Sequence, residues 1–224
     1  MNLYIWHRIP KVRQFYTRFR YQILLRKNGL RTAKNTDAVG WLKYSESAFA
    51  DWKPLTRRID FLVNTLDNQI RGSNSKILVL GPRFECEIYG YLSLGIKKKN
   101  LFAVDTFSYS PLIQCGNMHN LSEFPNEKFD IIIAGWTIVY AENPVTVVKE
   151  LSRLLKPTGK IILTWDSSSN VLFSHQEELF FENTSERKYQ VIDLVDSDSI
   201  LSWAVTRPSY NDGMQVITLV FGKQ

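Results

Sequence analysis

The sequence predicts an α/β fold in which a mostly parallel seven-stranded sheet is covered by helices on both faces. Three observations support this prediction. Apolar β-runs alternate with helical patterns over most of the chain after residue 75. The first run, Ile77-Leu78-Val79-Leu80, ends at Gly81-Pro82, which is typical of a strand buried on both faces of a parallel sheet. The last two runs, 200–206 and 215–221, flank Asp212-Gly213, which predicts a C-terminal antiparallel hairpin.

Length and composition suit one such domain with an N-terminal extension. The chain has 224 residues, of which 44% are hydrophobic and 22% charged. Its two cysteines, Cys86 and Cys115, lack the spacing of a zinc site or a disulfide framework, so we expect no metal. No apolar run approaches the roughly 20 residues that span a bilayer, and we expect no secretory signal. We therefore expect a cytoplasmic protein, with a location at the membrane periphery left open by its basic arm.

Positive charge is concentrated in this arm, residues 1–36, which holds nine Lys or Arg residues and no Asp or Glu. With an overall net charge of +6, the rest of the chain carries −3. A helix is predicted from Pro10 to Lys27 and should end at Gly29. Its apolar residues recur every three or four positions and form a stripe: Val12, Phe15, Tyr16, Phe19, Ile23 and Leu24.

Two interpretations of this helix are open. In the first, the stripe packs on the domain or on a second subunit, as in a homo-oligomer, and the arginines are solvated. In the second, the basic helix lies on an anionic membrane or on nucleic acid.

The next segment, 37–71, should contain a short helix capped by Asp37 and a second helix over 55–70. Between them lies an aromatic cluster that we expect to form a lid or cap: Trp41, Tyr44, Phe49 and Trp52. We divide the chain accordingly into an N-terminal helical cap, 1–72, and an α/β domain, 73–224.

The remaining elements follow from apolar periodicity and turn residues. The tetrapeptide Lys156-Pro157-Thr158-Gly159 should form a turn after a helix that begins at Asn143-Pro144. The predicted order is strand 76–80, helix 86–94, strand 101–104 before Asp105, strand 112–115, strand 129–134, helix 144–155, strand 161–165 before Asp166, a helix over 186–195, and the hairpin.

Residues 76–165 resemble the class I S-adenosylmethionine-dependent methyltransferases. Three blocks carry the resemblance, in the family's order and spacing: Gly116–Leu121, Phe129–Trp136 and Glu150–Lys160. The last is similar to the family's E-x-x-R-V-L-K-P-G-G segment. The resemblance implies a Rossmann-like fold and S-adenosylmethionine as cofactor.

Several site residues are implied by the same resemblance. Gly81 and Pro82 should turn the chain beneath the methionine part of the cofactor, and Asp105 should accept hydrogen bonds from the ribose hydroxyls. The other implied cofactor-binding residues are Thr106 beside that carboxylate, Asn117, Met118 and His119 around the adenine, and Gly135 and Trp136 near the methionine end.

The turn after the first strand departs from the family's G-x-G-x-G pattern. Its second and third glycine positions are occupied by Arg83 and Glu85. A glycine at these positions lets the backbone approach the ligand closely. We therefore hypothesise that Arg83 meets the methionine carboxylate and that Glu85 meets the ammonium group.

The resemblance implies transfer of a methyl group to O or N of a small molecule, sugar or related metabolite. A hydroxyl or protonated amine acceptor needs a base, and the candidates are His119, Tyr140, Asp166 and His175. Gly135-Trp136-Thr137-Ile138 stands where many base amino-methyltransferases have Asn/Asp-Pro-Pro-Tyr/Phe, which disfavours exocyclic base amines. Two alternatives are a non-catalytic methyltransferase-like module, and a methyltransferase recruited to nucleic acid or membrane by residues 1–36.

Overall fold

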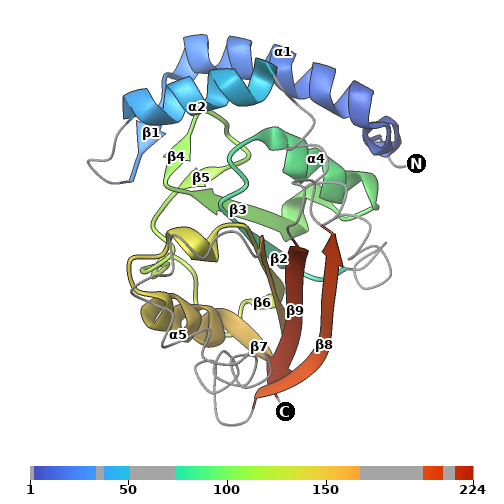
Figure 1. Ribbon diagram of the computed structural model, residues 1–224, viewed down its shortest axis with the longest axis vertical. Coiled ribbons are helices and arrows are strands. Elements are labelled where there is room, and N and C mark those ends of the chain that lie inside the picture. The colour runs from blue at the N-terminus through green and yellow to red at the C-terminus, as the bar shows by residue number, and fades with distance from the viewer. Residues whose placement is uncertain (1–2, 34–37, 51–73, 167–198, 209–214, 224) are drawn as a thin grey trace. The chain divides into compact units, whose positions relative to one another are not determined.

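A computed structural model of the chain describes residues 3–33, 38–50, 74–166, 199–208 and 215–223 (Figure 1). The chain forms two compact units, each interrupted in sequence. Unit 1 consists of Met1–Ser75 and Pro82–Asn117, and unit 2 of Lys76–Gly81 and Met118–Gln224. The predicted helices at 55–70 and 186–195, the cap Asp37 and the Asp212-Gly213 turn lie outside the described residues.

The N-terminal part of unit 1 is helical. The 3-10 helix η1, Ile5–Arg8, leads into α1, Pro10–Asn28, so the predicted helix is confirmed. Proline is tolerated in the first turn because its missing N–H has no intrahelical acceptor. Gly29 ends the helix with a φ of 66°, and its N–H donates to Leu25 O at 2.9 Å. A second helix, α2, covers Ala38–Ala50.

The orientation of α1 is the reverse of the one expected when its apolar stripe packs on the domain. Its buried residues are Arg13, Thr17 and Tyr21, at four-residue spacing. The stripe residues Phe15 and Phe19 are exposed instead. Within unit 1, the interpretation in which the stripe packs on the domain is therefore wrong, because the interior contacts of α1 are made by its opposite, more polar face.

The rest of unit 1 combines short strands with α4, Glu85–Ser93, and the 3-10 helix η2, Lys98–Asn100. β3, Leu101–Asp105, pairs in parallel with β5, Gln114–Cys115. The predicted helix at 86–94 and the strand ending at Asp105 are confirmed, whereas the strand predicted at 112–115 is only two residues long.

Between the two predicted strands 101–104 and 112–115, the structure contains a further strand. β4, Phe107–Ser108, pairs antiparallel with β1, Arg31–Thr32. The guanidinium of Arg31 fixes this loop by donating to Ser108 Oγ at 3.0 Å and Ser110 O at 2.8 Å. A two-residue pairing stabilised by one arginine has no periodic pattern that the sequence could reveal.

The core of unit 1 is aromatic. Tyr21 of α1 lies 4.5 Å from Phe49 of α2 and 4.9 Å from Tyr109, measured between ring centroids. Phe49 in turn lies 4.7 Å from Phe84, which precedes α4. Trp41 is also buried, with its ring 5.6 Å from that of Phe107. Trp41 and Phe49, expected in a lid or cap, are therefore core residues that hold α2 on the unit.

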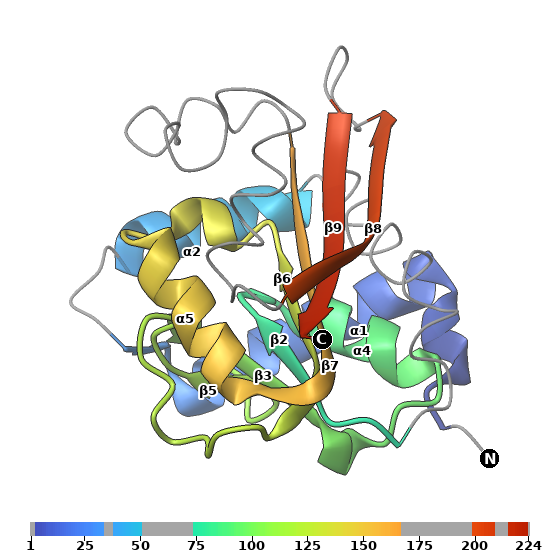
Figure 2. The ribbon, with the colours of Figure 1, turned by 90° about the horizontal axis from the view of Figure 1, so that it is seen from below.

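Unit 2 is built on a sheet whose strands lie in the order β2, β6, β7, β9, β8 (Figure 2). β2, β6 and β7 run parallel, and β9 is antiparallel to both β7 and β8. The side chains of β2 are all buried, as predicted for a parallel strand covered on both faces. The bounds are Ile77–Leu80 for β2, Phe129–Gly135 for β6, Leu155–Asp166 for β7, Ser199–Pro208 for β8 and Gln215–Lys223 for β9.

One long helix of unit 2, α5, covers Pro144–Leu154, and the 3-10 helix η3 covers Ile138–Tyr140. Asn143 caps α5 through Oδ1, which accepts from Thr146 N at 3.0 Å. Near the other end, Arg153 donates to Glu150 and to the carbonyl oxygens of Leu121 and Phe124. The Glu-x-x-Arg pair of the third sequence block therefore anchors the connection that precedes β6.

The tetrapeptide Lys156-Pro157-Thr158-Gly159 was predicted as a turn, and this is wrong. It belongs to β7, which begins directly after α5. Phe129 of β6 is paired with Leu155, but Ile131 is paired with Lys160, so the register shifts within this segment. The extra residues are accommodated as an irregularity of the strand, which lets a proline stand in an otherwise continuous β7.

Candidate cofactor site

In unit 2, the parallel strands β2 and β6 bring two predicted site residues to one edge of the sheet. Val79 is paired with Ile133, so Gly81 and Gly135 each follow two residues later. Gly81 has a φ of 65°, and a Cβ built there would lie 2.6 Å from Cγ2 of Thr137. The Thr137 hydroxyl donates to Leu80 O at 2.8 Å, which keeps the threonine against the glycine. Glycine is therefore required here by backbone conformation and by space.

Trp136 follows Gly135 in an unusual conformation. Its φ is 55°, in the left-handed region that bulky residues rarely adopt. The side chain is buried, and the backbone N–H donates to Thr164 O of β7 at 2.6 Å. Backbone strain of this kind concentrates where a chain has a functional task. The sequence assigned Gly135 and Trp136 to the methionine end of the cofactor, which stays a prediction.

In unit 1, Asp105 stands at the tip of β3 and is held by backbone N–H groups. Its Oδ2 accepts from Arg83 N at 2.9 Å, and its Oδ1 accepts from Phe107 N at 3.2 Å. Burial raises the pKa of the Asp105 carboxyl, while these N–H donors and the charge of Arg83 oppose the rise. The backbone N–H of Thr106 also stabilises the charged form, so three of the about four acceptor positions of this carboxylate face backbone donors.

Three further predicted residues of unit 1 lie near this tip in sequence or register. Pro82 is buried just before Arg83. Thr106 follows Asp105, and its carbonyl oxygen accepts from Ala33 N at 2.9 Å. Asn117 is two residues beyond Cys115, the residue paired with Asp105 in β5. The structure therefore groups Arg83, Asp105 and Asn117 within one unit, as a site around the β3 tip requires.

Arg83 divides its backbone and side chain between two tasks. Its φ is 40°, so a residue other than glycine adopts the left-handed conformation in the turn. The guanidinium carbon lies 4.0 Å from the centroid of the Tyr44 ring and 5.9 Å from that of Trp41. Nη1 is buried and has no hydrogen-bond partner among the residues that the structure describes. The sequence analysis did not predict that aromatic residues of α2 stack on Arg83, because nothing in the pattern of these aromatics indicates an arginine partner.

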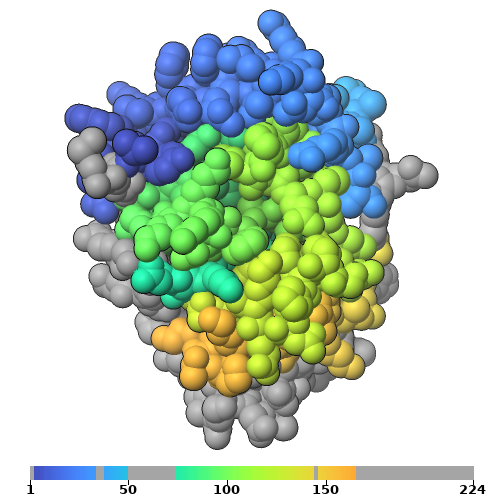
Figure 3. All heavy atoms as spheres, turned by 180° about the vertical axis from the view of Figure 1, so that it is seen from behind, coloured from blue at the N-terminus to red at the C-terminus, as the bar shows by residue number. Residues whose placement is uncertain are grey.

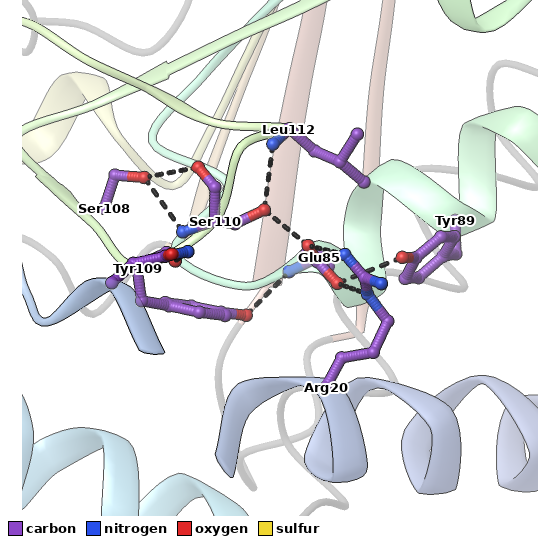
Figure 4. Close-up of polar contacts among 8 residues, drawn as sticks. Arg20, Glu85, Tyr89, Ser108, Tyr109, Ser110 and Leu112 are labelled. Carbon is purple, nitrogen blue, oxygen red and sulfur yellow. Dashed lines mark hydrogen bonds and ion pairs between the residues drawn. The ribbon is translucent and has the colours of Figure 1, made fainter. Parts of the chain in front are cut away.

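Glu85 has partners of its own inside unit 1 (Figure 4). Its fully buried carboxylate accepts from Arg20 Nε at 2.5 Å and Nη2 at 3.0 Å. The hydroxyls of Tyr89 and Ser110 donate to the same carboxylate. These contacts give Glu85 the task of holding α1 on α4, so we leave it out of the site proposed below. One feature of the sequence could have suggested this ion pair. Glu85 is an acid that follows closely on an apolar strand, and a buried acid needs a cation, which the acid-free basic arm could supply.

A second buried carboxylate, Glu87, was not singled out from the sequence. The hydroxyl of Tyr91 donates to its Oε1 at 2.9 Å. Burial, together with the negative charge of Asp105, raises its pKa to about 7, against a smaller lowering by the Tyr91 hydrogen bond. Its position within the fully buried helix α4 explains why desolvation dominates.

The candidate bases are distributed over unit 2. Nε2 of His119 accepts from Asn143 N at 3.1 Å, so that lone pair is used at the start of α5. Met118, its neighbour, is half-buried, and Tyr140 in η3 is 62% exposed. Asp166 is the last residue of β7, and His175 lies outside the described residues. The structure therefore brings His119 to the helix that follows η3, and leaves the assignment of a base as a prediction.

Comparison with known proteins places this fold. Residues 92–163 match a family model described as a methyltransferase domain. A TehB-like S-adenosylmethionine-dependent methyltransferase from Corynebacterium glutamicum has 16% identity and a TM-score of 0.52, over 84% of this chain and 100% of its own. A Burkholderia thailandensis 1,6-didemethyltoxoflavin-N1-methyltransferase, with bound 1,6-didemethyltoxoflavin and S-adenosylhomocysteine, has 11% identity and a TM-score of 0.55, over 87% and 95%.

A protein of known structure from Pyrococcus horikoshii is also similar, with 18% identity and a TM-score of 0.51 over 77% of this chain and 92% of its own. Comparison with curated protein sequences found no match. At identities this low, structural similarity shows the fold alone. The match to the methyltransferase domain begins at the end of α4 and ends within β7. The resemblance read from the sequence is therefore confirmed: the chain has the Rossmann-like fold of the class I S-adenosylmethionine-dependent methyltransferases.

Proposed function

We propose that the protein is an S-adenosylmethionine-dependent methyltransferase that acts on O or N of a small molecule, sugar or related metabolite. The observation that carries the proposal is the Asp105 carboxylate, which stands at the tip of β3 and is oriented there by the backbone N–H groups of Arg83 and Phe107. Two adjacent ribose hydroxyls are donors that suit this group. The residues that we assign to the cofactor are Gly81, Pro82, Arg83, Asp105, Thr106, Asn117, Met118, His119, Gly135 and Trp136.

Arg83 supports the same assignment. Its buried Nη1, without a partner among the described residues, is a donor that a methionine carboxylate would satisfy. Gly81 is required by its left-handed backbone and by the Thr137 side chain beside it, and its place beneath the methionine part of the cofactor is part of the proposal. In this proposal Arg83 takes over the recognition that the missing second glycine would otherwise leave to backbone atoms.

When bound, S-adenosylmethionine supplies a methyl group already activated on a sulfonium. What the chain must provide is orientation of the acceptor, exclusion of water and a destination for any proton released. His119 is one candidate proton acceptor. Because Nε2 accepts from Asn143 N, the neutral ring carries its proton on Nδ1, so His119 would take a further proton at Nε2 and release that contact. Tyr140, Asp166 and His175 are the other candidates.

A small acceptor is supported by two further considerations. The tetrapeptide after β6, Gly135-Trp136-Thr137-Ile138, differs from the motif of many base amino-methyltransferases. The structurally similar Burkholderia N1-methyltransferase has 1,6-didemethyltoxoflavin and S-adenosylhomocysteine bound. The acceptor class is therefore a metabolite in this proposal, with the methylated atom, O or N, to be identified.

Calorimetry with S-adenosylhomocysteine tests the proposal. The wild-type chain should bind, and Asp105→Ala should weaken binding by about tenfold or more, because a charged hydrogen-bond acceptor is lost. Glu123→Ala, an exposed acid of unit 2, should leave the affinity unchanged. No binding by the wild-type chain at millimolar cofactor would overturn the proposal and favour a non-catalytic methyltransferase-like module.

A further inference from the structure

The N-terminal helices η1 and α1 carry their apolar side chains on the outside of unit 1. Of the twelve large hydrophobic side chains that are exposed among the described residues, nine belong to residues 3–23. Leu3 and Phe15 are more than three-quarters exposed, at 77% and 76%. We call the following set the outer face: Leu3, Trp6, Val12, Phe15, Phe19 and Ile23. Figure 3 shows this segment, in blue, as a ridge along the outside of the unit.

The geometry of α1 makes the outer face continuous. Val12, Phe15, Phe19 and Ile23 follow each other at spacings of three or four residues, which places them in one stripe along the helix. At 100° per residue, exposed cations border this stripe. Lys11 and Arg18 fall on one side of it, Lys27 on the other, and Arg26 at its C-terminal end.

Polar contacts on the opposite side fix the helix in this orientation. Arg20 pairs with the buried Glu85, and Arg13 Nη1 donates to His7 O at 3.0 Å. Both ends of the segment are also attached, because Arg8 Nε donates to Ser93 O at 3.2 Å and Asn28 Nδ2 to Tyr109 O at 3.1 Å. Rolling the helix to bury the outer face would break these contacts and leave the Glu85 carboxylate unpaired. The outer face is therefore held outward.

The charged residues around the outer face indicate which kind of partner it can bind. A second copy of the chain docked through this face would bring together two sets of exposed cations, Lys11, Arg18, Arg26 and Lys27 of each copy, so like charges would oppose that pairing. For a nucleic acid, the outermost positions would have to be cationic, whereas here they are Phe, Trp and Leu. An anionic lipid surface can bind both the apolar and the cationic side chains. The apolar side chains would lie below the head groups, and the cations would lie at the level of the phosphates.

We propose that η1 and α1 dock on an anionic lipid bilayer and lie parallel to its surface. Trp6 suits the interface because its ring is amphipathic, and Phe15 and Phe19 reach the acyl boundary. None of the helices in the described part of the chain has the length and apolarity to cross a bilayer, so the contact is peripheral. This inference does not depend on the proposed cofactor site.

Sedimentation of the full chain with vesicles tests the proposal. Vesicles of phosphatidylcholine with phosphatidylserine should bind the protein, and vesicles of phosphatidylcholine alone, or high salt, should reduce binding by about tenfold or more. The double variant Phe15→Ala/Phe19→Ala should reduce binding to anionic vesicles by about tenfold or more, because apolar burial is lost. Val39→Ala, an equally exposed apolar residue on α2, should have no effect.

The charge contribution has its own matched pair of variants. Lys11→Ala/Arg18→Ala should weaken binding to anionic vesicles, whereas Lys98→Ala/Lys99→Ala, two exposed cations of the same unit, should not. Thermal unfolding controls for folding, since all of these side chains are exposed. The proposal is overturned by wild-type protein that ignores anionic vesicles, or by undiminished binding of Phe15→Ala/Phe19→Ala. It is equally overturned by light scattering that shows a stable dimer which that double variant dissociates.

Discussion

The backbone N–H of Arg83 donates to Oδ2 of Asp105 at 2.9 Å, so the residue that replaces a glycine also orients the carboxylate at the tip of β3. This contact uses only the main chain of Arg83. Its side chain, stacked on Tyr44, is left for a different task. The two parts of Arg83 can therefore be tested separately, because a substitution at position 83 changes the guanidinium and retains the N–H.

Arg83→Ala should discriminate between ligands with and without a carboxylate. If the guanidinium meets the methionine carboxylate, affinity for S-adenosylhomocysteine should fall by about tenfold or more, the contribution of a charge-assisted hydrogen bond. Affinity for adenosine, which has no carboxylate, should stay the same. Calorimetry with both ligands measures the difference, and an equal loss for the two would contradict the assignment.

Gly81→Ala should destabilise the chain more than Gly29→Ala does. Both glycines have nearly the same φ, 65° and 66°, so the cost of a left-handed alanine, about 1 kcal/mol, is common to both. Only at position 81 does the added Cβ meet Thr137, while nothing lies within 4 Å at position 29. Urea unfolding of the two variants measures the steric part, and equal destabilisation would show that Thr137 moves aside.

Arg20→Ala should destabilise unit 1 by about 3 kcal/mol, because it leaves the buried Glu85 carboxylate without a counter-ion. The double variant Arg20→Ala/Glu85→Gln should recover part of this loss, since a neutral amide is less costly to bury. Lys156→Ala removes the half-exposed pair with Asp130 and should cost no more than about 1 kcal/mol. Chemical unfolding compares the three. A double variant no more stable than Arg20→Ala would contradict this account.

Glu87→Gln should stabilise the protein above neutral pH and have little effect in acid. The folded-state pKa of Glu87 is about 7, above its usual value of 4.5, so the folded state holds a proton that the unfolded state releases between these values. Wild-type stability is therefore lost as pH rises from 4.5 through 7, by up to about 3 kcal/mol. Gln can still accept from Tyr91. The difference in unfolding free energy between variant and wild type should grow from pH 4.5 to 8, and a constant difference would refute the shifted pKa.

Strands and helices with strong periodicity were predictable from the sequence. The buried run of β2, the capped helix α5 and the strand that ends at Asp105 all follow from local patterns. The shift of register at Lys156–Gly159 did not, because Pro-Thr-Gly after a helix is also the ordinary composition of a turn. Only the pairing with β6 decides between the two, and pairing partners are not visible in the sequence.

The sequence predicted which residues form the candidate site, but it did not predict which other side chains those residues contact. Asp105 and Gly81 were identified through the family resemblance, and their roles at the cofactor stay predictions. Glu85 was predicted to meet the ammonium group of the cofactor, whereas its carboxylate pairs with Arg20, 65 positions away in the sequence. Nothing in the local sequence indicates this pair. The helix α1 shows the same limit. Its periodicity identified the two faces, but which face is buried depends on the buried acid of α4.

The order of strands in unit 2 has a consequence for how that sheet assembles. β8 precedes β9 in the sequence, yet β9 lies between β7 and β8 and pairs with both. In the described part of the chain, β8 has no route into the sheet except through a strand that is synthesised after it. The backbone of β8 therefore stays unpaired until β9 is present, and β8 joins the sheet only when β9 pairs with β7. Closure of this sheet should be a late, non-local step of folding, because β7 and β9 are far apart in the sequence, and the edge of β7 stays open to other strands until it is complete.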